Sequence, residues 1–379
     1  MSKEQVVVYL TQNSVTHHKD EIPETLAALQ KADQLGLGKK SMIPISDQFS
    51  DGTGTEQYAF GESTASSMTW WHDDSSLKSG QVRIGDRVLT LGANEDHVIE
   101  GGSEGWNANV EVKKPAIRRI RRDWKVALNH VGLSNGRADA VIRVLMTGND
   151  DTAKLMHSGG GACNELLQLI SVLNRAEMGE FEISSFVLSG HHYSGTSYIF
   201  GEKGDHEYDD DQVTGDTLDV RDIEKLSTVF PKAFAQVDSF MFSACNTHKL
   251  GLSDGDGQQR STQDWVSSTF PEAKRMSNWQ NIAPGSDYAA FFSGEFALDV
   301  AKEEAGSSSS AFDAWQFKKT SKGTNHRFEK DAAGDFQEMQ TSRSTSSYPH
   351  YNDYKGLRNS NHEAFHKRED LMRYILKKM

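Results

Sequence analysis

Two short apolar runs stand out in the pattern of hydrophobic and polar positions along the chain. The first covers residues 183–190 and leads directly into His191 and His192, and the second begins at residue 237 and ends at Cys245. A helical pattern precedes each run and a polar loop follows it, as is typical of buried strands in an α/β fold. The pattern therefore predicts two sheet strands with two histidines and a cysteine at their carboxyl ends, where open α/β sheets bind their ligands.

Helical spacing separates these predicted strands. Apolar residues fall on one stripe over residues 163–176 and again after Asp219, whose side chain suits a helix N-cap. An apolar run at residues 140–146 predicts a further strand before the first helix. Strand, helix, strand, helix, strand is a βαβαβ pattern, which implies parallel strands and right-handed crossovers. The predicted fold class is α/β, a mostly parallel sheet flanked by helices.

The pattern divides the chain into three parts. Residues 1–120 form a β-leaning N-terminal region, in which residues 6–10 predict a strand and residues 82–91 alternate around a Gly-Asp pair as a hairpin does. Residues 121–330 contain the predicted α/β domain. Residues 331–379 predict a polar, serine-containing linker that ends in an amphipathic helix with basic residues in its last turn.

The composition of the chain argues against nucleic acid and membranes as partners and favours one cellular compartment. The formal net charge of −13 argues against nucleic acid as a partner, because phosphate binding needs an excess of Lys and Arg. No apolar run approaches the roughly 20 residues that cross a bilayer, and the first residues lack the apolar core of a signal peptide. With 2 cysteines, at most one internal disulfide could form. We therefore expect a cytoplasmic protein without a membrane partner.

The residues around the two strand ends resemble a known pair of motifs. Residues 186–191 followed by residues 242–247 are similar to the His and Cys motifs of the caspase-like CHAT peptidases, in the clan that also holds caspases, metacaspases, legumain and separase. The resemblance covers residues 138–247. It implies a caspase-like peptidase domain in which Cys245 is the nucleophile and His191 is the general base. It also implies limited cleavage of a protein substrate, in bacterial defence or cell death, with an activating protein partner at the N-terminal region.

The resemblance departs from the family pattern at His192. CHAT peptidases usually have glycine after the catalytic histidine, and the amide of that residue forms the oxyanion hole together with the amide of the cysteine. This chain has its first glycine of the loop at Gly195, and the small Ala244 precedes the cysteine. Consecutive residues of an extended chain point to opposite sides, so only one of His191 and His192 can face Cys245. The motif favours His191 and leaves His192 as an oxyanion or supporting residue.

An acidic stretch follows the His motif and has three interpretations. It can be a solubilising loop, or a pocket that selects a basic side chain before the scissile bond, because opposite charges pair in a partly desolvated site. It can also contribute to a Ca²⁺ site together with Asp254 and Asp256, although neither segment matches a full calcium loop. No other cofactor is expected. The residues assigned to the pocket are Glu202, Asp205, Asp209, Asp210 and Asp211.

Four further hypotheses stay open at this point. Cys163 follows three glycines at a predicted helix start, where a thiol pKa is lowered, so it is a rival nucleophile. The segment His362-Glu363-Ala364-Phe365-His366 fits the zinc-hydrolase pattern. The polar segment 250–279, with its Lys274-Arg275 pair, is a candidate self-cleavage loop. Alternatively, the chain is a non-catalytic caspase-like adaptor, and its strand motifs belong only to the core.

Overall fold

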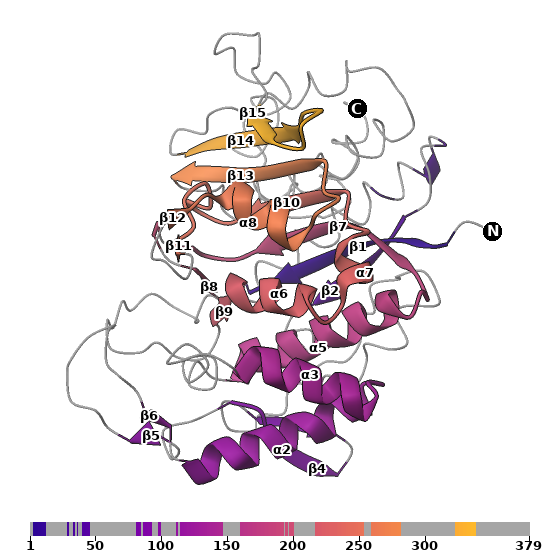
Figure 1. The fold of residues 1–379 in the computed structure, drawn as a ribbon, viewed down its shortest axis with the longest axis vertical. Coiled ribbons are helices and arrows are strands. Elements are labelled where there is room, and N and C mark those ends of the chain that lie inside the picture. Colours follow the sequence, from indigo (N-terminus) through magenta and orange to yellow (C-terminus); the bar gives the residue numbers. More distant parts are fainter. Residues whose placement is uncertain are drawn as a thin grey trace, which may run out of the picture.

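A seven-stranded sheet forms the centre of the computed structural model (Figure 1). Its strands lie in the order β15-β14-β13-β10-β7-β1-β2. The neighbouring strands β2, β1, β7, β10 and β13 run parallel to one another. Strand β14 is antiparallel to β13, and β15 is antiparallel to β14. The predicted class, a mostly parallel sheet flanked by helices, is confirmed. The strand bounds are β1 (Gln5–Thr11), β2 (Lys40–Ile45), β7 (Glu182–Ser189), β10 (Ser239–Ser243), β13 (Arg275–Asn281), β14 (Gly323–Lys330) and β15 (Phe336–Glu338).

The structure describes part of the chain. The described residues are 3–12, 29, 33–34, 36, 40–45, 81–84, 86–92, 98–99, 111–112, 114–146, 160–192, 194–195, 197–200, 217–253, 259–281 and 323–338. Their helices are α2 (Lys114–His130), α3 (Asn135–Met146), α5 (Gly160–Glu177), α6 (Val220–Ser227), α7 (Pro231–Phe234) and α8 (Thr262–Thr269). In this part of the chain, no helix is both long and apolar enough to cross a membrane.

Two-stranded antiparallel pairs accompany the main sheet. The hairpin predicted at residues 82–91 is confirmed, because β3 and β4, which follow one another in the sequence, pair in antiparallel register. The bounds of the strands in these pairs are β3 (Gln81–Ile84), β4 (Arg87–Thr90), β5 (Val98–Ile99), β6 (Glu111–Val112), β8 (Tyr198–Phe200), β9 (Thr217–Asp219), β11 (Leu252–Ser253) and β12 (Gln259–Arg260).

The N-terminal strand takes a place that its local pattern did not indicate. The strand predicted at residues 6–10 is confirmed as β1, and it lies in the main sheet between β7 and β2. Two strands of the region assigned to residues 1–120 therefore belong to the sheet that was expected to begin after residue 120. The hydrophobic run of β1 shows that it is buried, but a run of this kind carries no information about its partner.

The strand predicted at residues 140–146 is wrong, because these residues form the second half of helix α3. Ala138, Val141 and Leu145 are its buried positions, spaced three and four residues apart, which is the period of a helix. A short apolar run alone does not separate a buried strand from a buried helix segment. The first strand of the parallel unit is β1 instead, far upstream in the sequence.

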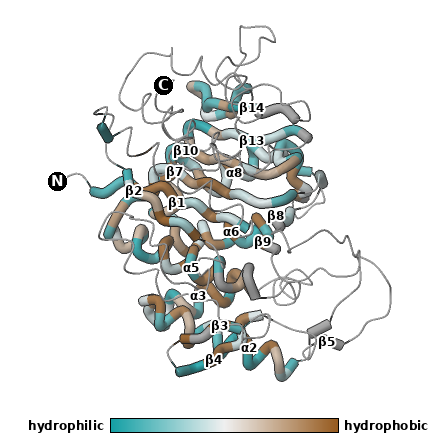
Figure 2. The backbone as a smooth tube through the Cα atoms, turned by 180° about the vertical axis from the view of Figure 1, so that it is seen from behind, coloured by the Kyte–Doolittle hydropathy of each residue, from teal (hydrophilic) through white to brown (hydrophobic). Residues whose placement is uncertain are grey.

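Helices α6, α7 and α8 lie on one face of the sheet (Figure 1), and aromatic side chains pack between α8 and the strands. Figure 1 views the sheet from the side on which α6, α7 and α8 lie, and Figure 2 views it from behind. Phe186 of β7 and Phe240 of β10 are directly paired and stack with their ring centroids 6.0 Å apart. Trp265 of α8 lies with its ring centroid 5.5 Å from that of Phe240. This packing fixes β7 and β10 against each other and against α8.

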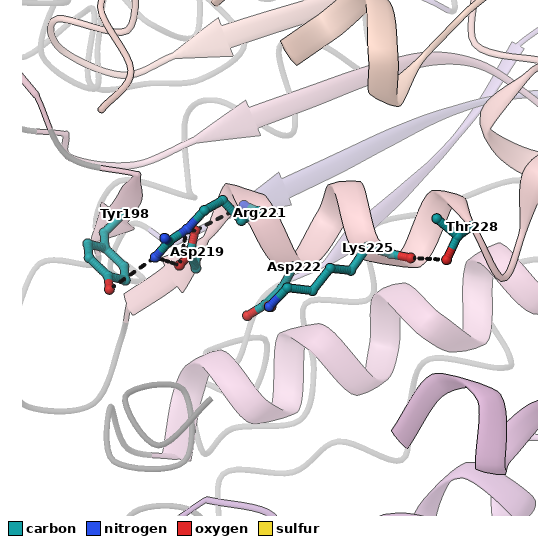
Figure 3. A network of polar contacts seen from close by, with 6 residues as sticks. All are labelled: Tyr198, Asp219, Arg221, Asp222, Lys225 and Thr228. Carbon is teal, nitrogen blue, oxygen red and sulfur yellow. Dashed lines mark hydrogen bonds and ion pairs between the residues drawn. The ribbon is translucent and has the colours of Figure 1, made fainter. Parts of the chain in front are cut away.

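Helix α6 begins as the sequence predicts. The Asp219 side chain accepts a hydrogen bond of 3.0 Å from the Arg221 backbone N–H, which makes Asp219 the N-cap. The Arg221 guanidinium returns to the same carboxylate at 2.6 Å and reaches the Tyr198 hydroxyl at 3.5 Å (Figure 3). Lys225 donates to Asp222 at 2.7 Å in the next turn. Local capping chemistry therefore sets the start of this helix.

Asp222 makes the stability of the fold depend on pH. Burial and, to a smaller extent, the charge of Asp219 raise the pKa of Asp222 to about 7, against the opposing effects of Lys225 and Arg221. An aspartate in the unfolded chain has a pKa near ~3.9, so the buried Asp222 costs no stability below ~4, costs more as the pH rises from ~4 to about 7, and keeps its full cost at higher pH. We expect Asp222→Asn to raise Tm by roughly 2–5 °C at alkaline pH and to leave it unchanged in acid. Thermal unfolding at several pH values measures this.

The matched control for Asp222→Asn is Asp139→Asn, because Asp139 also pairs with a lysine, Lys125 at 2.7 Å, but is exposed. Exposed ion pairs contribute little, so this variant should unfold like the wild type at every pH. A lower Tm for Asp222→Asn than for the wild type at alkaline pH would show that the bond to Lys225 outweighs the cost of burial.

Candidate active site

The register between β7 and β10 places the predicted catalytic residues at adjacent strand ends. Ser189 pairs with Ser243 as the last residues of two parallel neighbours. His191 and Cys245 each follow two residues later, so their separation of 54 positions (245 − 191) equals that of Ser189 and Ser243 (243 − 189). The Gly190 N–H still donates to the Ser243 carbonyl at 3.3 Å. The segments that follow β7 and β10 therefore leave the same edge of the sheet side by side.

The strand period distinguishes the two faces at this edge. Ser185 and Ser239 pair across the strands, with their hydroxyl oxygens 2.6 Å apart, on the face opposite the phenylalanines. Ser189 and Ser243 share that face, because side chains alternate along a strand. Cys245 is partly exposed and lies in a turn just beyond the strand. The assignment of Cys245 as nucleophile and His191 as base stays a prediction, and this register is what it rests on.

His192 has a contact that the sequence did not indicate. Its side chain is 2% exposed, and its Nδ1 lies 2.8 Å from the carbonyl oxygen of Cys245. A carbonyl only accepts hydrogen bonds, so Nδ1 carries the proton and donates. The ring therefore ties the end of β7 to the backbone of Cys245. The predicted oxyanion role of the His192 amide stays a prediction, as do the supporting roles of Gly195 and Ala244.

The turn that follows Cys245 has an unusual backbone. Asn246 has a φ of 54°, and it is the single non-glycine residue with a positive φ in the part of the chain that the structure describes. Asparagine adopts this left-handed conformation more readily than most residues. The Lys249 N–H closes the turn on the Asn246 carbonyl at 3.1 Å, and the Gly195 N–H donates to the Lys249 carbonyl at 3.2 Å. The loops after His192 and after Cys245 are thereby joined.

Two stacked imidazoles lie beside this turn. The His248 Nδ1 lies 3.2 Å from the carbonyl oxygen of Trp279, and its ring stacks on that of His326 with centroids 6.0 Å apart. The His326 Nδ1 lies 2.8 Å from a carboxylate oxygen of Glu338. Burial lowers the pKa of His248, and the charges of His326 and Lys249 lower it further, against the hydrogen bond to Trp279. Sequence patterns could not show this pair, because it depends on the pairing of β13 with β14.

Cys163 is not a credible nucleophile. It is 0% exposed, and burial, together with the charges of Asp222 and Glu165, raises the pKa of its thiol to about 12. The thiolate is the reactive form, so this cysteine lacks both access and ionisation. The helix expected after the three glycines is confirmed as α5, but the prediction that its start activates Cys163 is wrong.

The proposed cut at Lys274-Arg275 also conflicts with the structure. Arg275 is the first residue of β13, is 9% exposed, and forms an ion pair of 2.6 Å with Asp238. The Lys274 N–H donates to the Asp238 carbonyl at 2.8 Å. A peptidase needs an accessible, extended segment, and this one is part of the sheet. The burial of Arg275 in the sheet therefore argues against self-cleavage at this pair.

Several predicted site residues lie outside the described residues. They are the acidic pocket residues Glu202, Asp205, Asp209, Asp210 and Asp211, the calcium alternatives Asp254 and Asp256, and the zinc candidates His362, Glu363 and His366. Among the residues that the structure does describe, no group of three or more His, Cys, Asp and Glu side chains could hold a metal ion.

Comparison with solved structures shows a distant structural likeness. The fold is similar to that of a secreted C11 cysteine protease from Bacteroides thetaiotaomicron, solved by X-ray crystallography in complex with an irreversible peptide inhibitor. That neighbour is a cysteine protease. The TM-score is 0.32 at 10% identity, over 87% of this chain and 66% of that chain. No family model and no curated protein matches the sequence.

Proposed function

We propose that the protein is a cysteine endopeptidase in which His191 and Cys245 form a catalytic dyad. The observation that carries this proposal is the register of β7 and β10, which brings a histidine and a partly exposed cysteine to neighbouring strand ends. A free thiol has a pKa near ~8.5, so a neighbouring imidazole is needed to generate the thiolate at neutral pH.

In the proposed reaction, His191 accepts the thiol proton of Cys245, and the sulfur attacks the carbonyl carbon of the scissile peptide. The electron pair of the carbonyl moves to its oxygen, which the amide of Cys245 and one from residues 191–195 stabilise. When the oxyanion collapses, the C–N bond breaks, and His191 returns the proton to the leaving amine. Water, deprotonated by His191, then hydrolyses the thioester and restores the thiol.

The preferred substrate follows from the charge of the chain near the His motif. We propose that the acidic residues between 202 and 211 select a lysine or arginine just before the cut, because a carboxylate gains most from a basic partner in a partly desolvated pocket. The substrate is a protein that is cleaved at few sites in the cytoplasm, in bacterial defence or cell death. The chain alone has basal activity on peptides, and a partner protein that binds the N-terminal region raises this activity.

A peptide library tests this function. The wild-type chain should cut peptides after Lys or Arg, and EDTA should leave the rate unchanged. Replacing Asp209, Asp210 and Asp211 together by asparagine should lower the rate of cleavage after Arg by at least about tenfold, whereas Asp139→Asn should not. Loss of activity with EDTA that Zn²⁺ restores would favour the zinc alternative at His362, Glu363 and His366, whereas restoration by Ca²⁺ would favour the calcium site with Asp254 and Asp256. Absence of any cleavage by the wild type would contradict an endopeptidase.

A further inference from the structure

Strand β10 ends shortly before Cys245, whereas the neighbouring strand β13 continues further in the same direction. Pairing between β10 and β13 ends at Met241 and Ser277, but β13 continues to Asn281. The backbone N–H of Trp279 therefore lies beyond the last paired residue of β10. It donates instead to the side-chain oxygen of Thr247, at 3.1 Å. The Thr247 side chain thus provides the hydrogen-bond acceptor that a backbone carbonyl of β10 would provide if that strand continued.

The Thr247 hydroxyl uses both of its hydrogen-bonding capacities. Besides accepting from Trp279, it donates to the carbonyl of Ala244 at 3.0 Å, which closes the turn around Cys245 and Asn246. Thr247 is 0% exposed, so water does not compete for the hydrogen bonds of its hydroxyl. One buried hydroxyl thus links the residue before Cys245 to the neighbouring strand.

Helix α8 holds the same turn from another side. The Thr262 hydroxyl donates to the Thr247 carbonyl at 2.7 Å and accepts from the Leu250 N–H at 3.3 Å. Thr262 is the first residue of α8 and is fully buried. His192 holds the Cys245 carbonyl from the side of β7. The turn is therefore anchored to β7, β13 and α8, which together hold the left-handed backbone at Asn246.

We propose that Thr247 is a positioning residue for Cys245. This inference rests on the proposed function, since it assigns how the nucleophile is held for attack. Thr247 is buried and acts only through the turn, so it does not contact a substrate. Without this hydroxyl, its hydrogen bonds to the Ala244 carbonyl and from the Trp279 N–H are lost, and the backbone of Cys245 is held less firmly relative to the end of β7. The expected loss is in the chemical step rather than in substrate binding.

The test compares Thr247→Val, which keeps the shape and removes the hydroxyl, with Thr247→Ser, which keeps the hydroxyl. In the full chain, Thr247→Val should lower kcat on the best library peptide by about 10- to 100-fold with KM changed less than about twofold, and Thr247→Ser should stay within about threefold of the wild type. The second readout is the rate of alkylation of Cys245 by iodoacetamide, followed by mass spectrometry across a range of pH.

Alkylation decides the inference even if no peptide is cleaved, which would contradict only the proposed function. Slower alkylation of Cys245 in Thr247→Val, or a pH midpoint moved upward, with wild-type behaviour in Thr247→Ser, supports the positioning role. Alkylation of Thr247→Val at the wild-type rate and pH midpoint overturns it. If circular dichroism shows that Thr247→Val does not fold, Thr262→Val tests the same turn from α8, and wild-type reactivity there overturns the inference.

Discussion

Replacing Cys245 by alanine should lower peptide hydrolysis by at least about a thousandfold, because removal of a catalytic nucleophile leaves only binding and oxyanion contributions. The fold should be kept, since Cys245 lies beyond the end of β10 and its backbone, not its sulfur, carries the hydrogen bond from His192. The rate of cleavage of the best library peptide measures the activity, and circular dichroism checks the fold.

Cys163→Ala is the matched control, because it removes the other cysteine of the chain from the buried face of α5. This substitution should reduce stability slightly and leave the turnover per folded molecule close to that of the wild type. Full activity in Cys245→Ala, or its loss in Cys163→Ala with the fold intact, would contradict the assignment of the nucleophile.

Replacing His191 by alanine should lower kcat by about a hundred- to ten-thousandfold, because general acid–base catalysis contributes this much. The acid limb of the pH–rate profile should disappear with it, since protonation of this imidazole is what removes the base in the wild type. Measurement of kcat and KM between acid and alkaline pH gives both quantities for the same variant.

The adjacent histidine supplies the control for His191→Ala. Asparagine at position 192 keeps an N–H donor close to the place of Nδ1, so His192→Asn should still hold the Cys245 carbonyl and lose less than about tenfold in kcat. His192→Ala removes the donor and should lose more. If His192→Asn abolished activity and His191→Ala preserved it, the roles of the two histidines would be exchanged.

Local signals in the sequence identified the elements that carry the candidate site. The apolar runs of β7 and β10, the N-cap at Asp219 and the helix after the three glycines all depend on residues within one short segment. Such features are readable because propensity, capping and period act over a few residues. The run at residues 140–146 failed for the same reason, since its length fits a strand and a buried helix equally well.

The contacts that the sequence could not indicate all join distant segments. The place of β1 beside β7, the hydrogen bond from His192 to Cys245, the bridge from Thr247 to Trp279 and the His248–His326 stack each require a known strand order. The sequence around Thr247 does not indicate that its hydroxyl accepts a hydrogen bond from the backbone of β13. The residues that support Cys245, namely His192 and Thr247, can therefore be identified only when the register of the sheet is known.

Covalent labelling with a peptidyl electrophile tests the central assignment most directly. A peptide that ends in arginine and carries a thiol-reactive ketone is incubated with the wild type, Cys245→Ala and His191→Ala, and the modified residue is mapped by mass spectrometry. We expect one adduct on Cys245 in the wild type, none in Cys245→Ala, and much slower labelling in His191→Ala. Labelling of Cys163, or labelling of Cys245 at the same rate without His191, would contradict the proposed dyad.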